Sequence, residues 1–285
     1  MSVVAEQPAG APAAEAVMAR AATENFSVAG VLLPRRERSH LLAIYGFARL
    51  VDELGDAHEG DREQALDWLQ EELELAFAGR ARHPLLVRLE PTLSECRLRP
   101  GPFLRLIEAN RADQRVTRYR TWADLRAYCA LSADPVGELV LDVFGVATPA
   151  RVALSDSICT ALQLAEHCQD VAEDLAAGRV YLPLEDLERF GASVEDLAAP
   201  HAGAAVREVI AFEVARARSL LREGLPLVAQ LGGRARIGVA GYVGGGLAAL
   251  GAIERADHDV LAGAPRAGSL ARARCTVATL LAARR

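Results

Sequence analysis

Apolar residues recur with a helical period along almost the whole chain, and no other feature limits the fold as much. The pattern covers long segments at 36–57, 61–79, 84–97, 101–111, 121–145, 149–177, 204–231 and 235–262. Alternating patterns typical of strands are scarce, and no unit repeats at a fixed period. The sequence therefore predicts an all-α, single-domain helical bundle with a central cavity.

Proline or glycine separates these segments. Such residues stand at Pro34, Pro84, Pro100, Pro102, Gly145, Pro149 and Gly178. The 285 residues, 51% of them hydrophobic, are enough to form a substantial core. We expect a flexible segment at 1–18, the helical domain at 19–262 and a basic tail at 263–285.

The charged residues exclude several classes of function. The net charge is −6, whereas nucleic-acid binders normally present a basic surface to phosphates. All 32 basic residues are arginine, so the chain has no lysine for a Schiff base or a Walker-type phosphate loop. The charge of a phosphorylated ligand would have to be met by metal ions and arginine.

The cysteines and the termini bear on the cellular compartment. The five cysteines show no C-x-x-C spacing, so neither a zinc site nor a disulfide framework is predicted. The first twenty residues lack the basic start and apolar run of a signal peptide, and no uninterrupted apolar stretch reaches the roughly 18 residues of a membrane span. We expect a cytoplasmic protein.

The spacing Asp-x-x-x-Asp occurs twice in the helical segments, at Asp52 and Asp56 and again at Asp170 and Asp174. Positions four apart lie on one face of a helix, with Cβ atoms roughly 5–6 Å apart. Most such carboxylates simply face water. Here, however, apolar residues flank both pairs and turn each helix toward the core.

Two such pairs on facing helices would place four carboxylates around one small volume. Their repulsion is tolerable only with cations between them, and oxygen ligands favour Mg²⁺. Because Mg²⁺ usually completes its shell with waters and substrate phosphates, the pairs predict a site for Mg²⁺ and a diphosphate.

The residues around both pairs resemble the squalene and phytoene synthases, which join or rearrange isoprenoid diphosphates in an all-α isoprenoid synthase fold. The first block is YGFARLVDELGD at 45–56, preceded by Asn25-Phe26 and Leu33-Pro34. The second is QLAEHCQDVAEDLAAGRVYLP at 163–183, which ends in the G-R-x-Y-L-P element. The resemblance covers most of residues 23–262.

Residues 109–145 are similar to one branch of this family, the bacterial hydroxysqualene synthases of hopanoid pathways. This similarity is carried by Asp113-Gln114, Val116–Tyr119, Ser132-Ala133 and Pro135–Gly137. The resemblance implies Mg²⁺-dependent ionisation of presqualene diphosphate, rearrangement of the cation and its capture by water as hydroxysqualene. It implies Mg²⁺ as cofactor, with Mn²⁺ as a substitute, and no NADPH.

The resemblance also implies roles for individual residues. The catalytic set is Tyr45, Asp52, Asp56, Asp170 and Asp174. The metal ligands are the four aspartates, with Glu53 and Glu166 as further candidates. The substrate-binding set is Phe26, Arg49, Tyr119, Gln169, Arg179 and Tyr181. Phe47 and Phe144 are further candidates for an apolar tunnel, and for each aromatic residue ordinary core packing is an equal alternative.

Three positions depart from the family pattern. Glu53 stands where an aspartate is usual, and Glu166 stands where an asparagine is usual. Near the C-terminus the usual tyrosine falls at or near Gly246. The space at Gly244–Gly246 suggests the hypothesis that water enters there to reach the cation.

Alternatives remain within and outside this chemistry. The acidic blocks also suit head-to-head condensation of two prenyl diphosphates to presqualene diphosphate, squalene, dehydrosqualene or phytoene. A di-iron bundle needs Glu-x-x-His twice, and only Glu37-x-x-His40 occurs. The Gly244-x-Gly246-x-x-Ala249 match to a dinucleotide loop lacks a preceding strand. A non-enzymatic alternative is an inactive scaffold partner of a related synthase.

The expected partners follow from the same resemblance. They are an isoprenoid diphosphate substrate and companion enzymes of squalene synthesis, with no nucleic acid. The arginines and apolar residues of 266–285 suit an amphipathic helix at the inner face of a membrane, with a solvated tail as the alternative.

Overall fold

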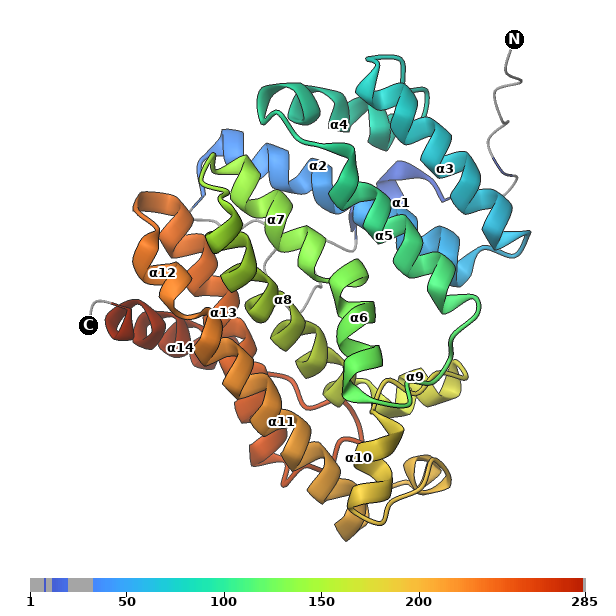
Figure 1. The fold of residues 1–285 in the computed structure, drawn as a ribbon, viewed down its shortest axis with the longest axis vertical. Helices are drawn as coiled ribbons and strands as arrows, with labels where there is room; N and C mark the ends of the chain where they lie inside the picture. Colours follow the sequence, from blue (N-terminus) through green and yellow to red (C-terminus); the bar gives the residue numbers. More distant parts are fainter. Residues whose placement is uncertain (1–7, 9–11, 20–32, 284–285) are drawn as a thin grey trace. The chain divides into compact units, whose positions relative to one another are not determined.

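The fold is known from a computed structural model that describes residues 8, 12–19 and 33–283 (Figure 1). Over these residues all regular secondary structure is helical. The only β-type pairing among them is an isolated bridge between Arg118 and Val180. The prediction of an all-α fold is confirmed. Phe26, a predicted substrate contact, lies outside the described residues.

The chain divides into two compact units. The N-terminal unit comprises Met1–Arg115 and Pro135–Thr148, and the C-terminal unit comprises Val116–Asp134 and Pro149–Arg285. The first acidic pair belongs to the N-terminal unit, and the second pair belongs to the C-terminal unit.

The N-terminal unit is built from six α-helices and one π-helical turn, within the residues described. They are α1 (Ala14–Ala19), α2 (Arg35–Asp52), η2 (Glu53–Ala57), α3 (Arg62–Phe77), α4 (Pro84–Glu95), α5 (Pro100–Asp113) and most of α7 (Asp134–Val143). Phe47 of α2 is fully buried, and its ring meets Phe103 of α5 edge-on at 5.0 Å. Phe47 is therefore a core residue and not part of a tunnel wall.

The C-terminal unit contains the longest helices. Its elements are α6 (Trp122–Ser132), α8 (Pro149–Gln169), α9 (Val171–Ala176), α10 (Leu184–Arg189), η3 (Glu195–Ala198), α11 (Ala204–Gly224), α12 (Pro226–Gln230), α13 (Gly233–Arg255) and α14 (Ser269–Ala282). In Figure 1, α8 and α11 run side by side, as do α13 and α14. These helices support the second acidic pair.

The glycines of α13 allow close helix packing. A Cβ added at Gly244 would lie 2.5 Å from the Thr276 backbone nitrogen of α14, and one at Gly246 would lie 2.5 Å from Leu162 Cδ2 of α8. Both glycines are buried. The hypothesis that water enters through Gly244–Gly246 is therefore wrong, because neighbouring helices occupy that space.

The predicted basic tail at 263–285 contains a helix within its described residues, and a helix there was one of the two alternatives. Within this range Ser269–Ala282 forms α14, which packs along α13. Gly244 allows the backbone of α14 to approach α13 closely. Three large apolar residues of α14, Leu270, Val277 and Leu281, remain exposed, so they do not take part in this contact.

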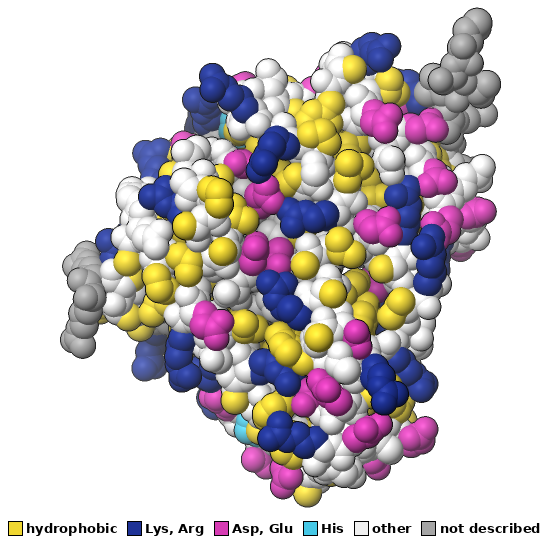
Figure 2. Space-filling view, in the orientation of Figure 1, with side chains coloured by type: hydrophobic (Ala, Val, Ile, Leu, Met, Phe, Trp, Pro, Cys, Tyr) yellow, Lys and Arg dark blue, Asp and Glu magenta, His cyan; other side chains and the backbone are white. Residues whose placement is uncertain are grey.

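Helix α13 is the one element of the described chain that is long and apolar enough to cross a membrane, judged by length and composition alone. However, 61% of the most apolar 18-residue stretch of α13 is buried inside the protein. A core helix has this character. On the face seen in Figure 2, arginine and acidic side chains are interspersed.

Candidate active site

The first acidic pair lies where α2 changes into a π-helical turn. Asp52 is the last residue of α2 and is half-buried, and Asp56 is exposed within η2. The sequence predicted one continuous α-helix through both residues, which is wrong from Glu53 onward. Single π-helical turns inside helices are rare and occur frequently at functional sites.

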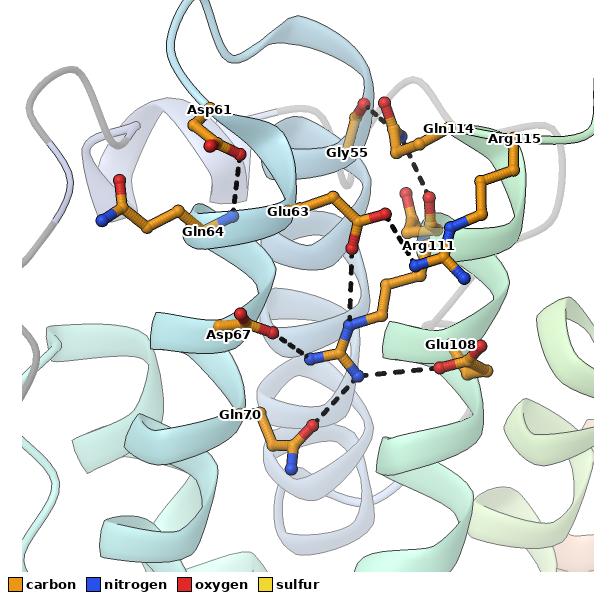
Figure 3. A network of polar contacts seen from close by, with 11 residues as sticks. Gly55, Asp61, Glu63, Gln64, Asp67, Gln70, Glu108, Arg111, Gln114 and Arg115 are labelled. Carbon is orange, nitrogen blue, oxygen red and sulfur yellow. Dashed lines mark hydrogen bonds and ion pairs between the residues drawn. The ribbon is translucent and has the colours of Figure 1, made fainter.

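Two amide side chains hold this turn: Asn110 of α5 and Gln114, which directly follows α5. Asn110 Nδ2 donates to Asp52 Oδ1 at 3.4 Å, and Gln114 Nε2 donates to the Gly55 carbonyl at 2.9 Å. A Cβ at Gly55 would overlap the Asn110 side chain, so only glycine permits this approach. Gln114 also donates to the Asn110 carbonyl at 3.0 Å. Figure 3 shows the contact between Gln114 and Gly55.

The other predicted residues of the first block lie on the same helix. Tyr45 is buried in α2. Arg49 Nη2 donates to Glu53 Oε1 at 3.0 Å, both side chains being largely buried. Arg49 and Glu53 therefore form an ion pair in this structure. For Arg49 to bind phosphate, or for Glu53 to bind a metal ion, this ion pair would have to open.

A cluster of ion pairs fixes α5 against α3, next to the π-helical turn (Figure 3). Arg111 donates to Asp67 at 2.6 Å and to Gln70 at 3.0 Å. Arg115 donates to Glu63 at 2.9 Å. Because α3 and α5 are joined in this way, Asn110 and Gln114 project from a fixed element.

The second acidic pair lies at the junction of α8 and α9. Asp170 is the residue between the two helices, so the continuous helix predicted over 149–177 is interrupted there. The α-helical hydrogen-bond register nevertheless continues, because Asp170 N donates to the Glu166 carbonyl and Asp174 N donates to the Asp170 carbonyl. Glu166, Asp170 and Asp174 thus keep their predicted spacing along one face.

The charge on Asp170 is poorly compensated. Burial raises the pKa of this carboxyl, nearby Glu173 raises it further, and Arg266 acts in the opposite direction. A cation beside Asp170 would stabilise its ionised form.

A short turn after α9 carries the G-R-x-Y-L-P residues. Gly178 has φ of +80°, and the Arg179 backbone nitrogen donates to the Asp174 carbonyl at 2.8 Å, which closes the helix. A small pocket lies beside this turn. It is lined by His167, Val171, Asp174, Arg179, Val180, Tyr181, Leu182 and Leu197.

Aromatic side chains form one buried wall of this region. Segment 117–120 runs beside 180–185, and the Val180 nitrogen donates to the Thr117 carbonyl, which brings Tyr119 to Tyr181. The rings of Tyr119 and Tyr181 stack at 5.7 Å, and Tyr128 lies 5.5 Å from Tyr181. Both predicted tyrosines, 119 and 181, therefore lie together in the C-terminal unit.

His167 completes this wall and was not predicted. Its ring stacks on Tyr181 with centroids 3.9 Å apart, and its Nδ1 lies 4.0 Å from Asp174 Oδ2. Burial lowers the pKa of His167 to about 3, so the ring is neutral at physiological pH.

Gln169, a predicted substrate contact, makes a hydrogen bond to the segment after α13. Its side chain is buried and donates to the Pro265 carbonyl. The segment after α13 is thereby tied to the second acidic block, and it brings the charge of Arg266 to Asp170. A substrate contact by Gln169 would require this hydrogen bond to be exchanged.

The carboxylate pairs suit Mg²⁺ held together with a phosphate ligand. Over the described residues no three His, Cys, Asp or Glu side chains gather closely enough to hold a metal by themselves. Mg²⁺ does not need such a cage, since it commonly uses one or two carboxylates, waters and substrate phosphates. The oxygen donors of each pair fit this mode of binding.

Asn110, Gln114, Tyr128, His167 and Arg266 are the neighbours that sequence reasoning did not identify as site residues. Gln114 and residues 116–119 had only marked the family branch. These residues reach the acidic blocks through contacts between helices that are distant in the sequence. Their spacing along the chain therefore does not predict them. The one available clue was the apolar setting of both acidic pairs, which requires polar partners when buried.

The arrangement is that of an isoprenoid synthase-type fold, and comparisons with known proteins agree. A family model for squalene/phytoene synthase matches residues 19–276. The chain belongs to the squalene/phytoene synthase family. It is 37% identical over 210 residues to hydroxysqualene synthase from Rhodopseudomonas palustris, which covers 73% of this chain and 71% of that protein.

Two solved structures are similar to the fold. Squalene synthase HpnC from Alicyclobacillus acidocaldarius is 49% identical, with a TM-score of 0.79 over 86% of this chain and 94% of that one. A dehydrosqualene synthase crystallised with a ligand is 20% identical and has a TM-score of 0.84, covering 95% of this chain and 96% of that one. The second likeness concerns the fold alone.

Proposed function

We propose that the protein converts presqualene diphosphate and water into hydroxysqualene and diphosphate. The 37% identity to the R. palustris hydroxysqualene synthase carries this proposal. A hydroxysqualene synthase from Sinorhizobium fredii, 35% identical over 73% of this chain, supports it as well. Both acidic pairs are intact here, which argues against an inactive scaffold partner.

The reaction balances without a reductant. The carbon–oxygen bond to the diphosphate breaks, and the electron pair leaves with the diphosphate. The cyclopropylcarbinyl cation that remains rearranges, a water oxygen bonds to the rearranged cation, and one proton is released. No NADPH is needed, because no hydride is added.

The chain's own residues have three tasks in this proposal. Asp52, Asp56, Asp170 and Asp174 would hold Mg²⁺, with Glu166 beside the second pair. Mg²⁺ bound with the diphosphate neutralises the charge that the leaving group gains. Arg179, at the pocket beside Asp174, is suited to bind a phosphate oxygen.

The aromatic wall suits a carbocation. Tyr119, Tyr128 and Tyr181 present ring faces, which attract positive charge. Neutral His167 adds a ring without adding a repelling charge. Burial of this cluster excludes bulk water, which limits premature capture of the cation.

Product analysis tests the proposal. Purified protein with Mg²⁺ and no nicotinamide is incubated separately with presqualene diphosphate and with farnesyl diphosphate, and the extracted lipids are analysed by mass spectrometry. We expect hydroxysqualene from presqualene diphosphate alone. A hydrocarbon from presqualene diphosphate, or no turnover of either substrate, would contradict the proposed reaction.

The second candidate is head-to-head condensation of two prenyl diphosphates. It is favoured by the 35% identity over 68% of this chain to 15-cis-phytoene synthase from Synechocystis, of which 62% is covered. A C30 diphosphate or hydrocarbon made from farnesyl diphosphate in the same assay would select this candidate.

We also propose a cytoplasmic location with peripheral contact to the inner face of the membrane. Helix α14 exposes Leu270, Val277 and Leu281, of which Leu270 is 75% exposed. Arg266 and Arg274 are exposed nearby, and no acidic residue follows Asp259. Co-sedimentation with vesicles containing anionic lipid, compared with neutral vesicles, tests this contact.

A further inference from the structure

We infer that Asn110 of α5 and Gln114, which directly follows α5, are positioning residues for the first acidic pair. They hold the π-helical turn in the geometry in which Asp52 and Asp56 bind a divalent cation with diphosphate. The inference rests on the proposed function and adds to it two side chains that contact neither the cation nor the substrate in their assigned role.

The contacts of Asn110 are suited to orienting Asp52. Its Nδ2 donates to Asp52 Oδ1 at 3.4 Å and to the Leu106 carbonyl of its own helix at 3.4 Å. Asn110 is 8% exposed, so its amide is held inside the unit. An amide orients a carboxylate without adding the positive charge that would weaken its attraction for a metal ion.

The contacts of Gln114 fix the backbone of the turn. Its Nε2 bridges the Gly55 carbonyl at 2.9 Å and the Asn110 carbonyl at 3.0 Å. A π-helical turn leaves carbonyl groups without their usual α-helical donors, and Gln114 supplies one such donor. Gly55 lies between Asp52 and Asp56, so this bond acts on the spacing of the pair.

Gly55 makes the arrangement possible. Any Cβ at this position would overlap Asn110 Oδ1 and crowd Asn110 Cγ, which lies 2.9 Å away. Side chains at 55 and 110 are therefore coupled: a larger residue at 55 must displace the Asn110 amide. This coupling provides a test that general destabilisation does not imitate.

The first experiment compares Asn110→Leu with the wild type. Leucine keeps the branched shape and removes the donor. Mn²⁺ binding in the presence of inorganic diphosphate is measured by electron paramagnetic resonance, and the melting temperature is measured without metal. We expect Mn²⁺ binding to weaken by about 10- to 100-fold, as for other residues that orient metal ligands. Unchanged Mn²⁺ binding in folded Asn110→Leu would overturn the inference.

Gln70→Leu is the matched control. Gln70 also makes an amide contact between α3 and α5, accepting from Arg111. We expect normal Mn²⁺ binding in Gln70→Leu and weakened binding in Gln114→Leu. Equal losses in both variants would show a general effect of loosening α5.

A double-mutant cycle covers the case in which Asn110→Leu does not fold. Gly55→Ala should weaken Mn²⁺ binding about tenfold when Asn110 is present, and should have little further effect when it is combined with Asn110→Ala. Additive losses would contradict the proposed coupling.

Failure of the proposed function gives a different result. In that case the wild type itself binds no Mn²⁺ with diphosphate and converts no isoprenoid diphosphate. A wild type that binds and turns over, beside an Asn110→Leu variant that does the same, refutes the positioning role alone.

Discussion

Glu213 is a fully buried acidic residue with a strongly raised pKa. It is fully buried in α11 and shares Arg216 with Asp186, so one guanidinium faces two carboxylates. Burial raises the pKa of Glu213 to about 8, because a proton on this residue leaves the cluster neutral. Arg216 also stacks on Trp122 and Phe212, which ties α11 to α6.

We predict that Glu213 makes the protein less stable as pH rises. Its folded pKa is raised above the ordinary 4.5, so the unfolded state loses the proton first and the stabilising contribution falls between about pH 4.5 and 8. Glu213→Gln removes this dependence. Thermal melts from pH 5 to 9 should show the variant gaining on the wild type with rising pH, on the order of 4 kcal/mol in total.

Exposed Glu208 on the same helix supplies the control. Glu208→Gln should follow the wild-type pH dependence. A Glu213→Gln curve parallel to the wild type over the whole range would refute the assignment.

At the scale of elements, the pairing of α13 with α14 depends on single glycines. Gly244 meets the backbone of Thr276, which cannot move as a side chain can. Gly241, one turn earlier on α13, has no atom within 4 Å of the position of a Cβ. The two glycines lie on the same helix, but only Gly241 has room for a Cβ atom.

We predict opposite effects of alanine at these positions. Gly244→Ala should destabilise the protein by about 1–3 kcal/mol through overpacking, and Gly241→Ala should stabilise it by about 0.5–1 kcal/mol through helix propensity. Denaturant unfolding of both variants measures the difference. Equal effects would mean that α14 does not pack on Gly244 in solution.

At the scale of the whole molecule, the proposed reaction would use both acidic pairs. Mg²⁺ with inorganic diphosphate should therefore raise the melting temperature, and saturation at 100 times Kd corresponds to about 2.7 kcal/mol. We predict that Asp52→Asn and Asp170→Asn each remove most of this shift and lower kcat/KM at least roughly 100-fold.

The control for these variants is Asp257→Asn, an exposed carboxylate that pairs with Arg207 instead. It should keep the shift induced by Mg²⁺ and diphosphate. A full shift in Asp170→Asn would remove the second pair from the metal site, and chelation with EDTA should abolish turnover of the wild type.

Sequence alone predicted the all-α class, most helix positions and the family, because helical periodicity and the two acidic blocks are local patterns. It missed breaks set by single residues. The segments expected at 121–145 and 204–231 each divide, near Pro135 and Pro226, since proline cannot continue the hydrogen-bond ladder. Helix α10 was missed because it is only six residues long.

What the sequence by itself determined is the inventory of chemistry: paired aspartates, arginine as the sole basic residue type, and the G-R-x-Y-L-P turn. Only the tertiary structure decided which side chains serve that chemistry. It turned Asp52–Asp56 into a π-helical site held by α5, placed His167 against Tyr181, and paired Arg49 with Glu53. Such contacts join residues far apart in the chain, and their energies depend on close packing that no local pattern encodes.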